Sequence, residues 1–397
     1  MSLLSNKIMQ LEESATLAMA RKSRELTSKG HNIINLSLGE PDFDTPEFIK
    51  TAAKKAIDDN YSKYTPVPGY KELLEVISYK FKRDNNLIYQ PEQIVCSTGA
   101  KQSIVQLLMV LLNKGDEVLL PAPYWVSYSQ MIKLAEGESK VINTDINNNF
   151  KITAKQLEAS ITEKTKVFLF SSPCNPTGTV YSKEELQELG EVFKKYKHIT
   201  IISDEIYEHI NFLNNHYSIG SIEGLEDQVV TVNGLSKGYA MTGWRFGYIG
   251  APKIIAKACI KMQGQLTSAT CSITQRAAIE ALSKSPECTY EMKNEFKKRC
   301  DLMIALLSNI KGIKLNKPDG AFYIFPDISA FFGKKYHTYD IKNADDLSMF
   351  LLEVGGVSTV SGTAFGNNDC IRISYAASRE ELTNASLLIK TTLNKLH

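Results

Sequence analysis

Short apolar runs that alternate with helical stretches limit the fold of this chain more than any other feature of its sequence. A strand that is apolar along its whole length needs cover on both faces, which a mostly parallel sheet between helices provides. The runs are residues 117–121, 166–170, 200–203, 228–232 and 246–250. Residues with helical periodicity lie around them, at 46–59, 69–84, 100–112, 183–197, 253–267 and 273–283. The sequence therefore predicts an α/β fold.

The pattern changes after a long charged helix that we expect near residues 290–311. Beyond it, helical and strand-like segments follow in a less regular order, at 321–325, 344–354, 370–375 and 379–395. We expect a large domain over residues 45–290 and a smaller α+β domain built from both chain ends, 1–44 and 291–397. A chain of 397 residues is long enough for two domains.

Composition argues against several classes of function. A net charge of +2 leaves no excess of basic residues for a nucleic-acid partner. No apolar run reaches the length of a membrane span, and the N-terminus lacks the pattern of a signal peptide. The seven cysteines are scattered without a CxxC pair, so we expect no disulfide framework, no metal site and a reducing, cytoplasmic location.

One stretch combines an amine with a guanidinium. Ser236 and Lys237 are followed by Arg245 eight residues after the lysine. The amine can form an imine with an aldehyde and the guanidinium can hold a phosphate, which together suit pyridoxal 5′-phosphate. Most lysines are solvated surface groups, so this interpretation depends on the rest of the chain.

Other candidates lie at predicted strand ends and helix starts, where open α/β sheets bind ligands. Gly99 and Ala100 open a helix whose first amides suit a phosphate, although a Thr followed by Gly, as at residues 98–99, commonly only caps a helix. Asp204 ends an apolar run, where a buried carboxylate needs a partner such as a ring N–H. Asp204 can equally be a helix cap.

Four more side chains are candidate site residues, for which a purely structural role is the alternative. Asn175 lies in a rigid turn of a kind that usually only connects elements, and with Tyr207 it can contact a ring hydroxyl. Trp125, which we expect early in a helix, can stack on a ring or pack in the core. Arg372 lies in an alternating strand, where it faces solvent or clamps a carboxylate.

Six motifs, taken together and in this order, resemble the fold-type I enzymes that use pyridoxal phosphate. The similarity runs from Ser14 to Arg372 and is strongest to class I aminotransferases, in particular the bacterial aspartate aminotransferases of the Iγ subgroup. The motifs are LGEPDFDTP (38–46), KYTPVPG (63–69), PAPYWVSY (121–128), SPCNPTG (172–178), DEIYEH (204–209) and AMTGWR (240–245). The resemblance implies a three-layer fold with the mostly parallel sheet in the large domain.

The resemblance also implies roles around the cofactor ring. Lys237 binds the cofactor covalently and later moves the proton of the reaction. Asp204 pairs with the pyridine nitrogen, and Tyr207 and Asn175 contact the ring oxygen. Trp125 stacks on the ring.

A second set of roles concerns the cofactor phosphate. The resemblance implies that it is held by Gly99, Ala100, Ser236 and Arg245. Tyr64 resembles the tyrosine that reaches the phosphate of a neighbouring subunit, which implies a homodimer with active sites completed across the interface.

Small amino acids and 2-oxo acids are the partners that the resemblance implies. Arg372 would clamp the substrate α-carboxylate, with Gly39, Trp125 and Asn175 nearby. Lys101 matches the lysine that meets the distal carboxylate, which points to L-aspartate and 2-oxoglutarate as substrates, with ping-pong kinetics. An aromatic aminotransferase on the same fold is an alternative.

Two residues depart from the family pattern. Gly234 stands where many relatives place a serine against the phosphate. Gln10 stands where an arginine has been linked to prephenate amination, so we expect little of that activity, although an arogenate-forming enzyme stays an alternative. The segment 8–20 is expected to fold over bound substrate.

Two other classes remain open on these motifs. A pyridoxal phosphate lyase that forms a cyclopropane ring from a sulfonium substrate keeps the same lysine, aspartate and arginine. It has no use for Lys101, so replacing this residue separates the two. A transcription regulator with a borrowed aminotransferase domain needs a winged-helix extension, for which the segment before Ser14 leaves no room.

Overall fold

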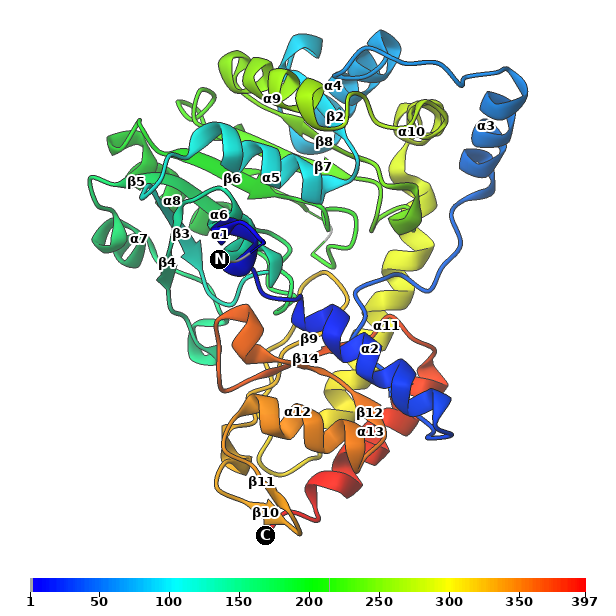
Figure 1. Ribbon diagram of the computed structural model, residues 1–397, viewed down its shortest axis with the longest axis vertical. Coiled ribbons are helices and arrows are strands. Elements are labelled where there is room, and N and C mark those ends of the chain that lie inside the picture. The colour runs from blue at the N-terminus through cyan, green and yellow to red at the C-terminus, as the bar shows by residue number, and fades with distance from the viewer. Residues whose placement is uncertain (1–2, 214) are drawn as a thin grey trace.

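The computed structural model describes residues 3–213 and 215–397. Residues 1 and 2 of the expected small domain and residue 214 of the expected large domain lie outside the described part. Figure 1 shows one part built around a large sheet and a second part that contains α2 (Ala15–Ser28) and the C-terminal segments. Helix α11 (Tyr290–Leu307) runs between them and begins where the two expected domains meet. The domain boundaries themselves stay a prediction.

The large sheet has seven strands. Its order is β2 (Ile94–Ser97), β8 (Gly247–Gly250), β7 (Val229–Gly234), β6 (Thr200–Asp204), β5 (Thr165–Ser171), β3 (Glu117–Pro121) and β4 (Glu138–Ile142). Neighbouring strands from β7 to β4 are parallel, whereas β8 is antiparallel to both β2 and β7. The predicted α/β fold with a mostly parallel sheet is therefore confirmed.

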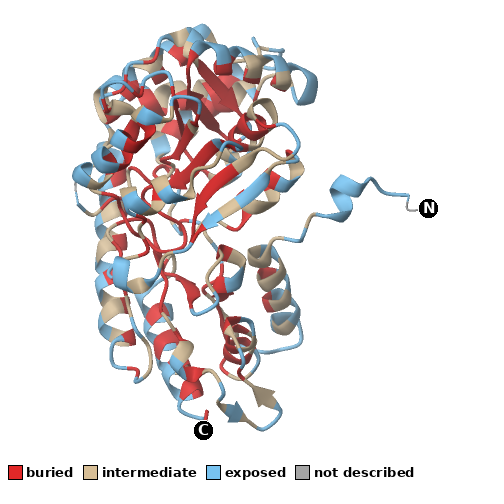
Figure 2. Cartoon of the chain, turned by 90° about the vertical axis from the view of Figure 1, so that its left-hand side faces the viewer, coloured by how far each residue is buried: buried red, intermediate tan, exposed pale blue. Residues whose placement is uncertain are grey.

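Helices cover both faces of this sheet because its strands carry apolar side chains on both faces. In β5, Val167 and Leu169 join the core on one face, and Phe168 and Phe170 join the core on the other. The first face is covered by α5 (Ala100–Leu111), α6 (Ser127–Leu134) and α9 (Lys253–Leu266). The opposite face is covered by α4 (Lys71–Asn85), α7 (Ala154–Ser160), α8 (Lys183–Lys195) and α10 (Ser272–Ser283), and α3 (Glu47–Asp58) packs on α10. Figure 2 shows the strands of this sheet as the most continuous buried region of the chain.

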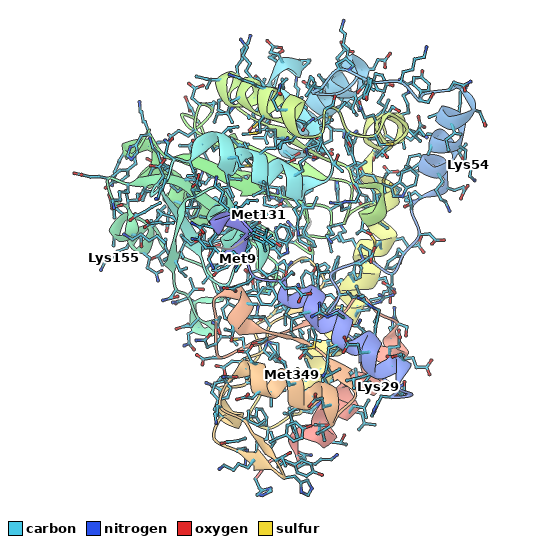
Figure 3. All side chains as sticks on the ribbon, in the orientation of Figure 1. Met9, Lys29, Lys54, Met131, Lys155 and Met349 are labelled. Atoms are coloured by element: carbon cyan, nitrogen blue, oxygen red, sulfur yellow. The ribbon has the colours of Figure 1, made fainter. Side chains whose placement is uncertain are left out.

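The second part is smaller and mixed. Its strands are β13 (Val360–Ser361), β14 (Ile371–Ser374) and β9 (Tyr323–Ile324) in one antiparallel sheet, with a separate hairpin of β10 (Lys335–Tyr336) and β11 (Tyr339–Asp340). The parallel pair β1 (Ile34–Asn35) and β12 (Val357–Ser358) joins the N-terminal segment to the C-terminal one. Helices α12 (Ala344–Glu353) and α13 (Arg379–Leu393) complete it. Figure 3 labels Met349 on α12 in this part and Met131 on α6 beside the large sheet.

Short elements connect these layers. Helix α1 (Asn6–Met9) contacts α6, so the first residues of the described chain lie against the large-sheet part before α2 enters the second part (Figure 1). The 3-10 turns are η1 (Pro91–Gln93), η2 (Ile146–Asn148), η3 (Ile219–Ser221), η4 (Thr242–Trp244), η5 (Pro286–Thr289), η6 (Ser329–Phe331) and η7 (Gly362–Phe365). Among the described residues, no helix has the length and apolar character needed to cross a membrane.

Candidate active site

One edge of the large sheet gathers the predicted site residues. Asp204 is the last residue of β6, and Asn175 and Lys237 follow the carboxyl ends of β5 and β7. Gly99 follows β2, which runs in the same direction as β7, because β8 lies between them and is antiparallel to both. Arg245 precedes β8 and therefore reaches the same edge from the opposite direction. This is the edge at which open α/β sheets bind ligands.

A cavity of about 350 Å³ lies at this edge. Most of the predicted site residues line it: Gly39, Ala100, Lys101, Trp125, Asn175, Asp204, Tyr207, Ser236, Lys237, Arg245 and Arg372. Gly99 lies directly behind the Arg245 side chain, since a Cβ at Gly99 would be 2.3 Å from Arg245 Nη2. Tyr64 is not brought to this cavity, and its side chain is 96% exposed.

The end of the cavity beneath α5 is suited to an anion. The first amides of a helix have no acceptor within the helix, and the helix dipole favours negative charge there. Gly99 has φ +85° at this N-terminus, a conformation that favours glycine. The Arg245 guanidinium is held in place by donating from Nη1 to the Thr242 carbonyl at 2.9 Å. Together with Ser236, which is buried, these groups form a phosphate-sized anion site.

The Lys237 amine lies at the centre of the cavity wall. Its Nζ donates to the Gly39 carbonyl at 2.5 Å. The pKa of Lys237 is lowered to about 8, chiefly by burial and also by the cations Arg372 and Arg245, against the opposing charges of Glu40 and Asp204. A substantial fraction of neutral amine at pH 7–8 is what an attack on a carbonyl requires.

Asp204 is a buried carboxylate without a cationic partner among the described residues. It accepts hydrogen bonds from the Tyr128 hydroxyl at 2.6 Å and from the Ile206 amide at 3.2 Å. Burial raises the pKa of Asp204 to about 6, and these two hydrogen bonds only partly oppose the shift. An N–H cation placed against this carboxylate would remove the cost of its burial.

Two tyrosines that sequence reasoning missed support this wall. Tyr128 lies within the quoted motif 121–128 and its ring meets Trp125 edge-on at 5.4 Å, so its spacing from the tryptophan was an available signal. Tyr323 shares a hydrogen bond of 2.8 Å with the Tyr207 hydroxyl. Nothing in the sequence places Tyr323 there until β9 is known to pair with β14.

Arg372 is the most unusual group in the cavity. The residue is 1% exposed, and it has no ion pair among the residues that the structure describes. Its Nη1 donates to Asn175 Oδ1 at 3.0 Å and its Nη2 donates to the Ser37 carbonyl at 2.5 Å, whereas its Nε has no partner. The Tyr323 ring lies 4.6 Å from the guanidinium carbon. A buried guanidinium without a counter-charge is costly, so the site is built to receive an anion.

Lys101 and Trp125 both line the cavity and face each other. The Lys101 Nζ lies 5.0 Å from the centre of the Trp125 ring. Partial burial and the neighbouring Arg245 lower the pKa of Lys101. The prediction that Trp125 lies early in a helix is wrong, because α6 begins at Ser127. The amide of Tyr124 donates instead to the Phe365 carbonyl at 3.0 Å, outside any helix.

The N-terminal segment reaches the cavity. Ser14, Thr16 and Leu17 line it, and Leu17 is 60% exposed. Two ion pairs tie the preceding residues to the large-sheet part, Lys7 with Glu136 at 2.8 Å and Lys133 with Glu12 at 3.3 Å. The segment is therefore placed at the cavity, while its movement on substrate binding stays a prediction.

Comparison with known proteins identifies the family. Residues 31–387 match the family described as aminotransferase class I and II. The chain belongs to this family. It is 45% identical over 397 residues to the probable aspartate/prephenate aminotransferase of Rickettsia conorii, covering 99% of both chains.

Solved aminotransferase structures share the fold over the whole chain. The aspartate aminotransferase of Rhizobium meliloti superposes with a TM-score of 0.97 at 38% identity, covering 100% of both chains. The aspartate aminotransferase of Thermus thermophilus with maleate gives a TM-score of 0.92 at 36% identity, covering 99% of this chain and 100% of that one. The predicted class I aminotransferase family, the fold and the enzyme class are thus confirmed, and dependence on pyridoxal phosphate is a general property of this family.

The aminotransferase cavity fits that cofactor on its own chemistry. It combines a primary amine of lowered pKa, an anion site at a helix N-terminus and a buried carboxylate that lacks a cation. An aldehyde, a phosphate and a pyridinium N–H are the groups that these three features require. The crowding at Gly234 explains its departure from the family pattern, since a Cβ there would lie 2.8 Å from the Phe246 carbonyl oxygen.

Proposed function

We propose that this aminotransferase moves the amino group of L-aspartate to 2-oxoglutarate with pyridoxal 5′-phosphate, giving oxaloacetate and L-glutamate. The observation that carries the proposal is Arg372, a buried guanidinium with a free Nε, in the same cavity as Lys237. A planar guanidinium is the preferred bidentate partner of a carboxylate, which every α-amino acid carries. Asn175 and the Ser37 carbonyl hold this guanidinium in orientation.

Lys237 is the residue that we propose to do the proton chemistry. When bound, the cofactor supplies an aldehyde for imine exchange and a ring that accepts electrons from the substrate. As a free amine, Lys237 would take the proton from the substrate Cα and hold it for return to a neighbouring atom. Its lowered pKa suits this role, because the same amine must accept and release a proton near neutral pH.

The other residues bind and orient. We assign the phosphate to Gly99, Ala100, Ser236 and Arg245, which meet at the N-terminus of α5. Asp204, fixed by Tyr128, would hold the proton on the pyridine nitrogen.

Ring contacts complete this assignment. Tyr207 and Asn175 would contact the ring oxygen and Trp125 would stack on the ring. Gly39 would lie beside the substrate, near the amine of Lys237 that its carbonyl now accepts from.

Lys101 is the residue that we propose to select a dicarboxylate. It lines the cavity against Trp125 and is a further cation there besides Arg372, Arg245 and Lys237. The Thermus thermophilus enzyme, whose structure contains the dicarboxylate maleate, shares this fold closely, which supports the assignment. An aromatic donor or a cyclopropane-forming lyase would make no use of this ammonium.

Lys101→Met tests this proposal. We expect kcat/KM for L-aspartate to fall about 10- to 100-fold, the size of a lost charge-assisted hydrogen bond, while kcat/KM for L-phenylalanine changes little. A steady-state assay of oxaloacetate formation measures the first, and Lys155→Met, at an exposed lysine on α7 (Figure 3), is the matched control. Unchanged aspartate kinetics in Lys101→Met would contradict the dicarboxylate assignment.

Prephenate is a second candidate amino acceptor. The relative from Rickettsia conorii, at 45% identity, carries prephenate in its name, which favours this alternative. Against it, Gln10 lies exposed at the end of α1 and offers an amide in place of a guanidinium. We therefore propose low prephenate activity, and arogenate formation at a rate near that of aspartate transamination would show the opposite.

We also propose a homodimer in the cytoplasm. Tyr64, with its side chain 96% exposed on a single chain, is the residue that we assign to the phosphate site of the partner. All seven cysteines are free thiols, which supports a reducing compartment. A mass in solution of one 44.3 kDa chain would contradict the dimer.

A further inference from the structure

The turn that follows β6 has two faces. Asp204 and Tyr207 line the cavity described above. Glu205 and Glu208, which alternate with them in sequence, are 1% and 7% exposed and do not line it. A buried carboxylate is costly unless it is paired, so these two residues need partners on the far side of the turn.

Glu208 has a complete set of partners there. The ammonium of Lys80, which is 0% exposed, forms a short ion pair with Glu208 Oε1 and donates to Asn85 Oδ1 at 2.7 Å. Asn85 Nδ2 donates to Glu208 Oε2 at 2.5 Å, and His209 Nε2 lies 3.1 Å from Glu208 Oε1. Burial alone would raise the pKa of Glu208, but the charges of Lys80, His209 and His216 together outweigh it, and the pKa lies well below its ordinary value.

Glu205 depends on a histidine. Its Oε2 lies 2.8 Å from His216 Nε2, and its Oε1 accepts from Ser218 at 2.5 Å and Ser203 at 2.9 Å. The His216 side chain is 9% exposed. Burial opposes the charging of His216, but the charge and hydrogen bond of Glu205 together with the charge of Glu208 outweigh it and raise the pKa of the imidazole above its ordinary value.

Charge balance follows from these contacts. Two carboxylates face two cations when His216 is protonated, and one negative charge is left uncompensated when it is neutral. Asn85 Nδ2 also lies 3.3 Å from Glu205 Oε2, so the two halves form one network. The other titratable groups that face it across a polar cavity of about 240 Å³ are Asp84, His209, Tyr290 and Lys293.

Two triads of carboxylate and imidazole groups in this network, Glu205/Glu208/His216 and Asp84/Glu208/His209, have the spacing of metal ligands. Lys80 already supplies positive charge at Glu208, the residue that both triads share. The carboxylate oxygens of Glu205 and Glu208 all have donors without an ion. The described side chains therefore satisfy these carboxylates by themselves, and we interpret the cluster as an ion network.

The network is electrostatically connected to the cavity. The negative charge of Glu205 is one of the influences that raise the pKa of Asp204, after the larger effect of burial. Asp204 in turn opposes the lowering of the pKa of Lys237, although more weakly than Glu40 does. Glu205, together with the imidazole of His216 that it contacts, is therefore part of the charge environment of Asp204.

We propose that Lys80, Glu205, Glu208 and His216 are positioning residues for Asp204 and Tyr207, and that the charge of the Glu205–His216 pair acts on Asp204 and, through Asp204, on the bound cofactor. The proposal rests on the proposed binding of the cofactor at Lys237. These four residues would act on the site without contacting substrate or cofactor.

The test uses the visible absorbance of the lysine-bound cofactor, followed against pH in the holoenzyme without substrate. His216→Gln keeps a donor to Glu205 but removes the positive charge, so the pH midpoint of the absorbance change rises by about 0.5 pH unit. Glu205→Gln removes the negative charge and lowers the midpoint by a similar amount. His198→Gln, at an exposed histidine, leaves the midpoint unchanged.

A second measurement separates an effect on the site residues from an effect on the stability of the fold. Thermal unfolding of the cofactor-free protein reports the network without the cofactor. Because the pKa of His216 is raised on folding, its contribution is complete below its unfolded pKa and is lost as pH rises through the folded pKa, and His216→Gln lacks this dependence. Midpoints of absorbance that do not move in variants whose thermal stability does change would overturn the proposal, since the network would then be structural only.

If a single variant fails to fold, a double variant takes its place in the test. Glu208→Gln alone leaves Lys80 buried without its partner, whereas Lys80→Met together with Glu208→Gln removes both charges. The double variant changes no net charge, so its midpoint is expected to stay near that of the wild type. His216→Gln placed in this background is expected to raise the midpoint as before, and a midpoint that does not rise contradicts the proposal. A wild-type protein with no visible band at all would contradict the proposed cofactor function instead.

Discussion

At the scale of single residues, Asp204 is a carboxylate whose burial is unfavourable until a cationic ligand binds. Its carboxylate is 4% exposed and receives only hydrogen bonds from Tyr128 and Ile206. The folded protein without cofactor therefore tolerates a charge that a cationic ligand would stabilise. Groups of this kind commonly exchange stability for function.

Asp204→Asn is predicted to stabilise the cofactor-free protein in a pH-dependent way. The pKa of Asp204 is raised to about 6 from 3.8, so between about pH 4 and 6 the folded state binds more protons than the unfolded state, and the free energy of unfolding falls as pH rises. Two pKa units correspond to about 3 kcal/mol. The advantage of the Asn variant over the wild type should thus grow by about that amount across this range.

Urea unfolding at several pH values measures this difference, with Asp58→Asn, at an exposed aspartate, as the control. The same Asn variant should lose most of its transaminase activity when loaded with cofactor. If the free energy of unfolding varied with pH in the same way in Asp204→Asn and in the wild type, the fold would not raise the pKa of Asp204.

The chemistry-bearing residues could be predicted because residue type and motif order already restrict them. Lys237, Asp204 and Arg372 all reach one cavity, as expected. Tyr323 could not be predicted, because it supports the site only through the pairing of β9 with β14. Tyr64 stays a prediction, since its proposed contact lies on a partner chain.

At the scale of elements, the N-terminus of α5 depends on one glycine. Gly99 has φ +85°, and its missing Cβ leaves room for the Arg245 guanidinium. Gly115 has the same φ of +85° but no atoms within 4 Å of an added Cβ. The two glycines therefore separate backbone strain from crowding.

Gly99→Ala is predicted to weaken cofactor binding, and Gly115→Ala is not. Both variants carry about 1 kcal/mol of backbone strain, but only the first displaces Arg245. We expect the dissociation constant of pyridoxal phosphate to rise about tenfold or more in Gly99→Ala, measured by equilibrium dialysis. Equal cofactor affinity in the two variants would mean that Arg245 does not hold the phosphate.

Most long elements could be predicted from periodicity, and the short ones could not. The runs at 117–121 and 166–170 are strands because both of their faces are buried. The edge strand β4, with only Ile142 fully buried, has no continuous apolar run to reveal it. The run 321–325 forms only the two-residue strand β9, because its flanking residues bond to loops, as when Ala321 donates to the Ile210 carbonyl.

At the scale of the whole molecule, the site is shared by both parts of the chain. Lys237 and Asp204 come from the large sheet, whereas Arg372 comes from β14. The anchor of the guanidinium, the Ser37 carbonyl, lies in the segment between β1 and α3. Bound substrate would therefore contact both parts at once, which is the physical reason to expect closure around it.

The overall class could be predicted from sequence because continuous apolar strands admit few architectures. The limits of the two domains could not be fixed, since α11 continues from one part into the other without a linker (Figure 1). Contacts such as the ion pair of 2.7 Å between Arg299 on α11 and Asp42 join segments far apart in the sequence and leave no signal in composition.

An absorbance titration of the purified holoenzyme with L-aspartate, beside Lys237→Ala, tests the central claim most directly. We predict that aspartate removes the visible band of the lysine-bound cofactor, produces the shorter-wavelength band of the aminated cofactor, and releases oxaloacetate in equal amount. Lys237→Ala should show no such conversion at a comparable rate. A yellow protein whose spectrum aspartate leaves unchanged would contradict the proposed aspartate aminotransferase.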